Sequence, residues 1–172
     1  MKSIVVYFSK AGENYSNGSV VNLSKGNTEV AAEFIRDITG ADLFHIEPTT
    51  VFPTDYYACT DVAKEELNAN ARPALKRWPA TDLSEYDVVY VGYPIWWGTF
   101  PMAVFTFLEK YNWAGKIIMP FSTHEGSNLG HSESDIKRIC TGADVKPGLA
   151  IHGTGVKSSK GAIEKWIKSN LD

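Results

Sequence analysis

Hydrophobic runs of strand length alternate with longer amphipathic stretches along this chain, and the alternation repeats five times. Runs of the first kind are typical of strands buried on both faces, and stretches of the second kind are typical of helices that bury one face. We expect five strands, over residues 3–8, 43–46, 88–91, 117–121 and 148–152. We expect five helices, over residues 28–39, 56–69, 101–111, 134–140 and 160–171.

Strands that alternate with helices in this way predict an α/β fold around a parallel sheet. Because each crossover between parallel strands is right-handed, five such units place helices on both faces of the sheet. The chain has 172 residues, of which 44% are hydrophobic and 22% charged, and no repeat or low-complexity linker divides it. We therefore expect one domain over residues 1–172 with a single core.

Composition narrows the classes of protein further. The formal net charge of -3 comes with no concentrated basic surface, which argues against nucleic acid as a partner. The longest apolar runs fall far below the ~20 residues that cross a bilayer, and no secretory signal precedes the first strand. Cys59 and Cys140 belong to no CxxC motif and no His/Cys cluster. We expect a cytoplasmic protein with no membrane contact, no metal site and two incidental thiols.

One segment does not fit a compact β-α unit. Residues 10–27, between the first strand and the first helix, make a connection of eighteen residues, whereas such loops usually span ~2 to 6. Its polar content agrees with an excursion over the surface. A longer loop costs little additional loop-closure entropy, so a long insertion can be tolerated. The segment is either a functional loop or a tolerated insertion, and its role stays open.

The first β-α junction has the chemistry of a phosphate site. Gly26, Asn27 and Thr28 stand at a helix start, where backbone N–H groups, short polar side chains and the helix dipole favour an anion. The alternative is an ordinary N-cap, in which Asn27 or Thr28 covers its own helix. Neither a Walker P-loop nor a dinucleotide-binding fingerprint is present at this junction.

The segment from Gly92 to Pro101, GYPIWWGTFP, carries two adjacent tryptophans between a strand end and a helix start. Ligands bind beyond the carboxyl ends of strands in open α/β sheets, so this is a position for a platform under a flat ring. Adjacent side chains at a strand end point to opposite sides. One indole is therefore expected to pack in the core or in a subunit interface, and the other is free to stack.

A third loop follows the fourth expected strand and reads FSTHEGSNLG over residues 121–130. Its glycines can bring backbone amides close to the edge of a ligand. His124 is either a general acid or a hydrogen-bonding residue, and no catalytic cluster surrounds it. Taken together, a phosphate-binding end, an aromatic stacking face and a rim of amides describe a site for flavin mononucleotide (FMN).

These motifs resemble the flavodoxin family, and most of all bacterial flavodoxin-like proteins with a WWGT loop. The matching residues are Tyr7 to Ser9, Gly26 to Thr28, Pro94 to Pro101 and Phe121 to Ser127, within compatible elements over essentially the whole chain. The resemblance implies a flavodoxin-like three-layer sandwich. Its five-stranded parallel sheet would have the order 2-1-3-4-5, with strands numbered along the chain and FMN at the carboxyl edge.

The resemblance also implies a set of cofactor-binding residues. The phosphate end would comprise Ser9, Lys10, Gly26, Asn27 and Thr28. The isoalloxazine ring would lie against Pro94, Ile95, Trp96, Trp97 and Gly98, with Trp97 stacked on it and Trp96 at its margin or in the fold. The other edge of the ring would meet Thr123, His124, Glu125 and Gly126.

Three features depart from the family pattern. The insertion separates Ser9 from Gly26, and Lys10 and Lys25 bring positive charge to its two ends, either to neutralise the phosphate or to be solvated. Glu125 stands where related loops often carry glycine, and a carboxylate pointing toward the flavin would lower its potential. The chain is only slightly acidic, so electrostatic steering toward basic partners is expected to be weak.

The function implied is electron transfer between redox partner proteins, in which FMN does the redox chemistry and no acid, base or nucleophile is needed. We expect a monomer or a weak dimer. The alternative is an FMN-dependent NAD(P)H:quinone or nitro-compound oxidoreductase on the same fold, with His124 or Tyr93 aiding proton transfer. A third possibility is a non-redox module that holds a partner peptide with the tryptophan loop.

Overall fold

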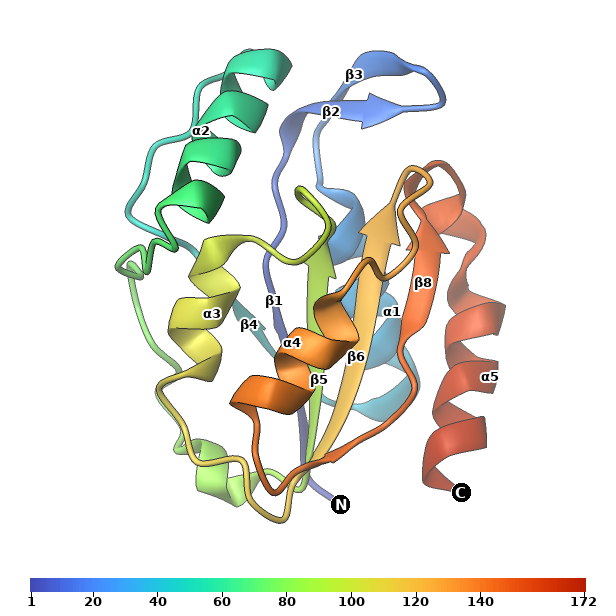
Figure 1. Cartoon of the computed structure of the whole chain (residues 1–172). Helices are drawn as coiled ribbons and strands as arrows, with labels where there is room; N and C mark the ends of the chain where they lie inside the picture. Colours follow the sequence, from blue (N-terminus) through green and yellow to red (C-terminus); the bar gives the residue numbers. More distant parts are fainter.

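The structure of this protein, a computed structural model, describes all 172 residues. A parallel sheet flanked by helices forms its body, and a separate two-stranded hairpin lies at one end (Figure 1). The strands of the sheet are β1 (Ser3–Tyr7), β4 (Asp42–His45), β5 (Val88–Pro94), β6 (Ile117–His124), β7 (Asp144–Val145) and β8 (Leu149–His152). The α-helices are α1 (Asn27–Thr39), α2 (Tyr56–Asn68), α3 (Met102–Leu108), α4 (Ser132–Ile139) and α5 (Lys160–Leu171). Two short 3-10 helices are η1 (Leu83–Glu85) and η2 (Gly153–Ser158).

The order of the strands is β4-β1-β5-β6, and all pairings in the sheet are parallel. The expected order is thereby confirmed, because these are the second, first, third and fourth expected strands. The fifth position is shared: β7 pairs with the start of β6 and β8 pairs with its end. The short strand β7 was not expected from the sequence.

The side chains of β5 contribute to a hydrophobic core on each face of the sheet, because successive side chains of a strand point to opposite faces. Val89 and Val91 join the core under α3 and α4, and Val88 and Tyr90 join the core under α1 and α5. Figure 1 shows α3 and α4 in front of the sheet and α1 behind it. The three layers expected from the sequence are present.

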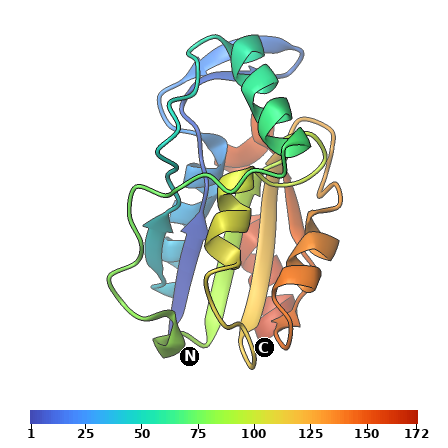
Figure 2. The same cartoon turned by 60° about the vertical axis from the view of Figure 1, so that its left-hand side comes forward.

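The insertion is an ordered β-hairpin rather than an irregular loop. Strands β2 (Gly12–Ser16) and β3 (Ser19–Leu23) pair antiparallel around Asn17 and Gly18, whose φ angles are 49° and 85°. Two successive residues with positive φ make a type I′ turn, which Asn-Gly favours. Both views place the hairpin and α2 together beyond the carboxyl ends of the strands (Figures 1 and 2).

Element ends differ from expectation where the site lies. Strands β5 and β6 each run three residues further than expected, and Pro94 pairs with Thr123 in register. Residues 92–94 and 122–124, which were expected in loops, therefore belong to the strands, and strand pairing holds them rigidly. Helix α3 is shorter than expected at its end, because the indole Nε1 of Trp113 donates to the carbonyl of Leu108 at 2.6 Å.

Candidate functional site

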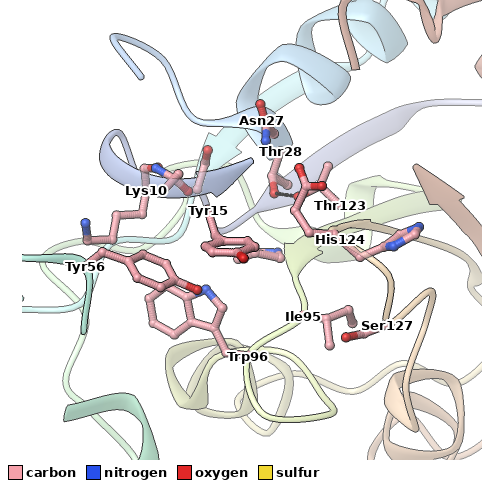
Figure 3. A pocket seen from close by; sticks show the side chains of 14 residues that line it. Lys10, Tyr15, Asn27, Thr28, Tyr56, Ile95, Trp96, Thr123, His124 and Ser127 are labelled. Carbon is pink, nitrogen blue, oxygen red and sulfur yellow. Dashed lines mark hydrogen bonds between the residues drawn. The ribbon is translucent and has the colours of Figure 1, made fainter. Parts of the chain in front are cut away.

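A cavity of about 200 Å³, called the first cavity below, opens at the carboxyl ends of β1, β5 and β6 (Figure 3). The structure brings into its lining most of the residues expected from the sequence: Ser9, Lys10, Asn27, Thr28, Pro94, Ile95, Trp96, Thr123, His124 and Glu125. Four further residues that sequence reasoning missed complete the lining: Asn14, Tyr15, Tyr56 and Ser127. Gly26, Trp97, Gly98 and Gly126 do not line it.

The junction of β1 and α1 forms a tight polar cradle. Gly26 is the N-cap of α1 and supplies no side-chain cap, so the amides of Asn27 and Thr28 have no partner within the helix. The Ser9 hydroxyl accepts from the Glu29 amide at 3.1 Å. A Cβ on Gly26 would lie 2.2 Å from Ser9 Oγ and 2.8 Å from the Lys10 carbonyl oxygen. Gly26 therefore shapes the cradle without lining the cavity, because only glycine lets the strand end and the helix start approach this closely.

Two threonines join α1 to β6 on the polar side of the first cavity. The hydroxyls of Thr28 and Thr123 are 2.8 Å apart, and both residues are buried. The Thr28 hydroxyl is thus committed to Thr123 and does not cap its own helix. The pair fixes the first turn of α1 relative to the end of β6, as Figure 3 shows.

Glu125 points toward η2 at the α1 end of the first cavity. Its carboxylate accepts from the Thr154 hydroxyl at 3.0 Å and lies 3.3 Å from Nε2 of His152. A Cβ on Gly153 would meet both the side-chain nitrogen Nδ2 of Asn27, at 2.6 Å, and Glu125 Oε1, at 3.0 Å. The carboxylate therefore stands beside the start of α1, where the sequence left its direction open.

His124 is held as a neutral imidazole. Its Nδ1 accepts from the Gly126 amide at 2.9 Å, which leaves Nε2 to carry the ring proton. Burial and the neighbouring His152 lower the pKa of His124 below its ordinary range, against an opposing effect of Glu125. At neutral pH this ring adds no positive charge to the first cavity.

Three aromatic rings line the side of the first cavity opposite the threonines (Figure 3). Trp96 is held edge-on by Phe8 and Phe52, with ring centroids 5.1 and 5.4 Å away. Tyr15 comes from the hairpin, and its ring centroid lies 5.9 Å from that of Tyr56, the first residue of α2. The Asn17-Gly18 pair is a hairpin signal that the sequence analysis did not use, and it would not by itself have placed Tyr15 in the cavity.

Contacts at both ends hold the hairpin in place. The Glu13 carboxylate accepts from the Tyr56 amide at 2.9 Å, and the hydroxyls of Ser16 and Thr154 are 3.2 Å apart. The insertion therefore spans from α2 to η2 across the carboxyl edge of the sheet. It forms part of the site instead of a separate surface excursion.

Trp97 turns away from the first cavity. Its φ is 56° and that of Gly98 is 89°, so the two residues form a tight turn closed by the Trp96 amide donating to the Thr99 carbonyl at 2.7 Å. The Trp97 indole Nε1 donates to the Thr60 carbonyl of α2 at 3.0 Å, and the ring is 49% exposed. The tryptophan side chain that lines the first cavity is thus Trp96, whereas the resemblance implied that Trp97 stacks on the ring.

A second cavity, of about 370 Å³, adjoins the first between the hairpin and α2. Lys10, Asn14, Tyr56, Ile95 and Trp96 line both cavities. The second cavity alone is lined by Glu13, Tyr57, Cys59, Thr60, Ala63 and Trp97. The two cavities therefore form one continuous trough that is polar at the α1 end and aromatic at the α2 end.

Other residues singled out in the sequence lie elsewhere. Lys25 pairs with Glu33 of α1 at 2.6 Å, so of the two insertion lysines only Lys10 reaches the trough. Tyr93 is fully buried, and its hydroxyl donates to Ser132 at 2.9 Å. Burial raises the pKa of Tyr93 far above its ordinary range. Proton transfer at the first cavity by Tyr93 is therefore not supported.

The structure contains neither a helix that could span a membrane nor a cluster that could hold a metal ion. None of the helices combines the length and the apolar character that a membrane-spanning segment requires. No group of three or more His, Cys, Asp or Glu side chains is arranged to hold a metal ion.

Comparisons with known proteins agree on one family. The sequence model described as flavodoxin matches residues 18–170, and no curated protein matches the chain. A protein from Bacteroides eggerthii described as a flavoprotein is 30% identical, with a TM-score of 0.77 over 98% of this chain and 96% of that one. A flavoprotein from Lactobacillus acidophilus, solved in complex with FMN, is 23% identical, with a TM-score of 0.65 over 91% and 97%.

An NADH:FMN oxidoreductase in its apo form is 15% identical, with a TM-score of 0.54 over 100% of this chain and 91% of that one. This likeness and that to the Lactobacillus protein show the fold alone. The family match covers most of the chain, including the Trp96 and Thr123 segments. The chain belongs to the flavodoxin family.

Proposed function

We propose that this protein binds FMN in the trough and transfers electrons between redox partner proteins. The observation that carries the proposal is the convergence of three strand ends on the first cavity, with a helix start whose first two amides have no partner within the helix, a half-buried indole and a rim of polar groups around it. Each matches one part of FMN: phosphate, flat ring and polar ring edge.

The chain's residues fit this cofactor. The Asn27 and Thr28 amides and the Asn27 side chain provide donors for a phosphate, and the α1 dipole adds positive potential there. Trp96 offers a ring face whose orientation Phe8 and Phe52 already fix. The first cavity by itself is smaller than the ~300 Å³ at which ligand sites usually begin, so FMN would extend along the trough or displace Tyr15.

Bound FMN supplies one- and two-electron redox chemistry, and the protein supplies binding, orientation and electrostatics. Trp96 and Tyr15 would cover the ring and exclude water from it. His124, held neutral with its proton on Nε2, would not offset the negative charge of Glu125. The ring that pairs with Glu125 is His152, which carries a charge only when protonated. No side chain has to act as acid or base for electron transfer.

The same fold serves both carriers and enzymes, so the fold does not decide between them. One observation favours the second candidate, an FMN-dependent oxidoreductase: the second cavity is larger than the first and opens into it. Space left in the trough beside bound FMN would admit a small-molecule substrate, which a pure electron carrier does not need.

Two measurements test the proposal. The purified chain is first reconstituted with FMN, and a flavin absorption band that stays with the protein through gel filtration is expected. Absence of that band would refute both candidates. Oxidation of NADH and NADPH is then followed with a quinone as acceptor and no added reductase, and rapid turnover would reject the carrier in favour of the oxidoreductase.

Replacing Glu125 with glutamine is expected to tighten FMN binding by about twofold to tenfold. A carboxylate near a phosphate opposes its binding, because two unit charges 4 Å apart interact by about 1 kcal/mol in water and by more at a partly buried site. Glutamine keeps the acceptor for Thr154. The gain, measured by quenching of FMN fluorescence, should shrink as salt increases. The matched control is Glu164→Gln, at an exposed position of α5, which removes the same charge far from the cradle; equal gains in both variants would count against a phosphate beside Asn27.

A further inference from the structure

We propose that Asp135 of α4 is a positioning residue for the ring of the cofactor. It holds the turn from Trp96 to Thr99 in the conformation that places the Trp96 side chain in the first cavity. The inference rests on the proposed FMN site for its functional meaning. Asp135 lines neither cavity of the trough, so it would act through the turn and without contact with FMN.

The turn needs support from other elements because its backbone conformation is unfavourable. Trp97 has a φ of 56°, which residues with bulky side chains rarely adopt, since the Cβ then crowds the following carbonyl oxygen. Within the turn, the Trp96 amide donates to the Thr99 carbonyl. On the α2 side, the Trp97 indole donates to the Thr60 carbonyl. The last two residues of the turn, Gly98 and Thr99, are held from the opposite side, by the start of α4.

Asp135 binds the side chain of the last residue of the turn. The Thr99 hydroxyl donates to Asp135 Oδ2 at 2.7 Å, and Thr99 is 1% exposed. The Asp135 side chain is 14% exposed, so little water competes for this bond. A hydrogen bond to an ionised carboxylate is about twice as strong as one between neutral groups. Without Asp135, the Thr99 hydroxyl would stay buried and unpaired, or the turn would move to expose it.

Two further side chains fix the direction of the carboxylate. Nδ1 of His131, the residue before α4, donates to the same Oδ2 at 2.8 Å, and Arg138 donates to Oδ1 at 3.1 Å. An acidic residue in the first turn of a helix also interacts favourably with the helix dipole. That effect does not require an oxygen directed at a hydroxyl of another element. The geometry of Asp135 is therefore specific to the Thr99 contact.

The backbone at the start of α4 holds the other residue of the turn. The His131 amide donates to the Gly98 carbonyl at 2.8 Å. A Cβ on Gly130 would lie 2.1 Å from the Gly98 carbonyl oxygen, so only glycine at position 130 lets the two segments approach this closely. Two successive residues of the turn are thus bound to the start of α4, one through the backbone and one through Asp135.

The test compares Asp135→Ala with Asp135→Asn by titration of FMN fluorescence. Alanine removes the acceptor and should weaken FMN binding by about fivefold, the effect of losing about 1 kcal/mol. Asparagine keeps an acceptor oxygen for Thr99 and removes only the charge, so FMN affinity should stay within about twofold of wild type. Equal losses in the two variants would show that the charge matters and not the position, and would overturn the inference. The control is Asp37→Ala, which removes an exposed carboxylate that pairs with Arg36 in α1 and should leave FMN affinity unchanged.

A double-mutant cycle tests whether Asp135 acts through Thr99. Thr99→Val removes the hydroxyl with little change in side-chain volume and should by itself weaken FMN binding by about fivefold. The double variant Thr99→Val/Asp135→Ala should lose no more than either single variant, whereas independent effects would multiply to about 25-fold. Losses that multiply would assign Asp135 a role apart from the turn and would overturn the inference.

A spectroscopic measurement reports on the turn in the absence of FMN. In the apo-protein labelled with 5-fluorotryptophan, the fluorine NMR resonances of Trp96 and Trp97 should shift in Asp135→Ala and stay in place in Asp135→Asn. The resonances of Trp113 and Trp166, which are buried in the two cores, should not move in either variant. A general loss of stability would not shift the first pair selectively. Single Trp→Phe variants assign the resonances.

The outcomes separate this inference from the proposed FMN site. Unmoved Trp96 and Trp97 resonances in Asp135→Ala would overturn the inference whether or not the protein binds FMN. Shifted resonances with unchanged FMN affinity would also overturn it, because the turn would then not position the ring site. Failure of the wild-type protein to take up FMN would refute the FMN proposal, and selective shifts in the apo-protein would in that case still support Asp135 as the residue that sets the turn.

Discussion

Replacing Gly26 with alanine is expected to lower FMN affinity by about a hundredfold or more. The new Cβ would stand 2.2 Å from Ser9 Oγ and 2.8 Å from the Lys10 carbonyl, and the second of these atoms belongs to the backbone. The start of α1 must therefore move away from the end of β1. Hydrogen bonds to a charged group contribute about 1.5–3 kcal/mol each, so misplacing two amides costs about two orders of magnitude in affinity.

The measurement is titration of FMN fluorescence, with thermal unfolding followed by circular dichroism to confirm that the variant folds. Overpacking of this kind also costs about 1–3 kcal/mol of stability. Gly161→Ala is the matched control: Gly161 is an exposed residue in the first turn of α5 with nothing near its Cβ, so the substitution should preserve the fold and leave FMN affinity unchanged. If Gly26→Ala binds FMN as wild type does, the cradle is not the phosphate site.

Replacing Trp96 with alanine is expected to weaken FMN binding by about tenfold or more, and by more than Trp97→Ala does. Stacked aromatic pairs contribute about 0.5–1.5 kcal/mol beyond the apolar area they bury. Trp96 is the indole that lines the first cavity, and its ring is already fixed by Phe8 and Phe52, so little entropy is lost when a flat ligand meets it.

A conservative change tests whether the ring face is what matters. Trp96→Phe retains a planar ring in the same place and should recover most of the affinity that alanine loses. Both are measured by fluorescence titration against Trp97→Ala. If Trp97→Ala shows the larger loss, the stacking role returns to Trp97, and the turn at Gly98 must then rearrange when the cofactor binds.

The sequence by itself determined the architecture, because that depends on local patterning. Alternating strand-length and amphipathic runs specify β-α units, and right-handed crossovers then limit the topology. Resemblance added the strand order, which the structure confirms. The three segments proposed to bind FMN were also visible in the sequence, since each stands at the end of a strand at the same edge: Ser9 after β1, the tryptophans after β5 and Thr123 at the end of β6.

Element ends were less predictable. Strands β5 and β6 continue through Pro94 and His124 because they pair with each other, and pairing is a property of two segments brought together by the fold. Helix α3 stops early because Trp113, five residues beyond Leu108, supplies the donor that the next helical turn would have provided. Neither the strand pairing nor the Trp113 contact can be predicted from the intrinsic propensity of a single segment.

Only the tertiary structure decided how the site is divided. The Asn-Gly turn indicates a hairpin, but its attachment to α2 and η2, through Glu13 and Ser16, is what brings Tyr15 over the first cavity. A two-residue turn with positive φ at Trp97 separates two identical side chains, one toward the first cavity and one toward α2. The direction of Glu125 depends on Thr154 and His152, which are distant in sequence. Local pattern sets which segments reach the sheet edge, whereas contacts between segments set where each side chain points.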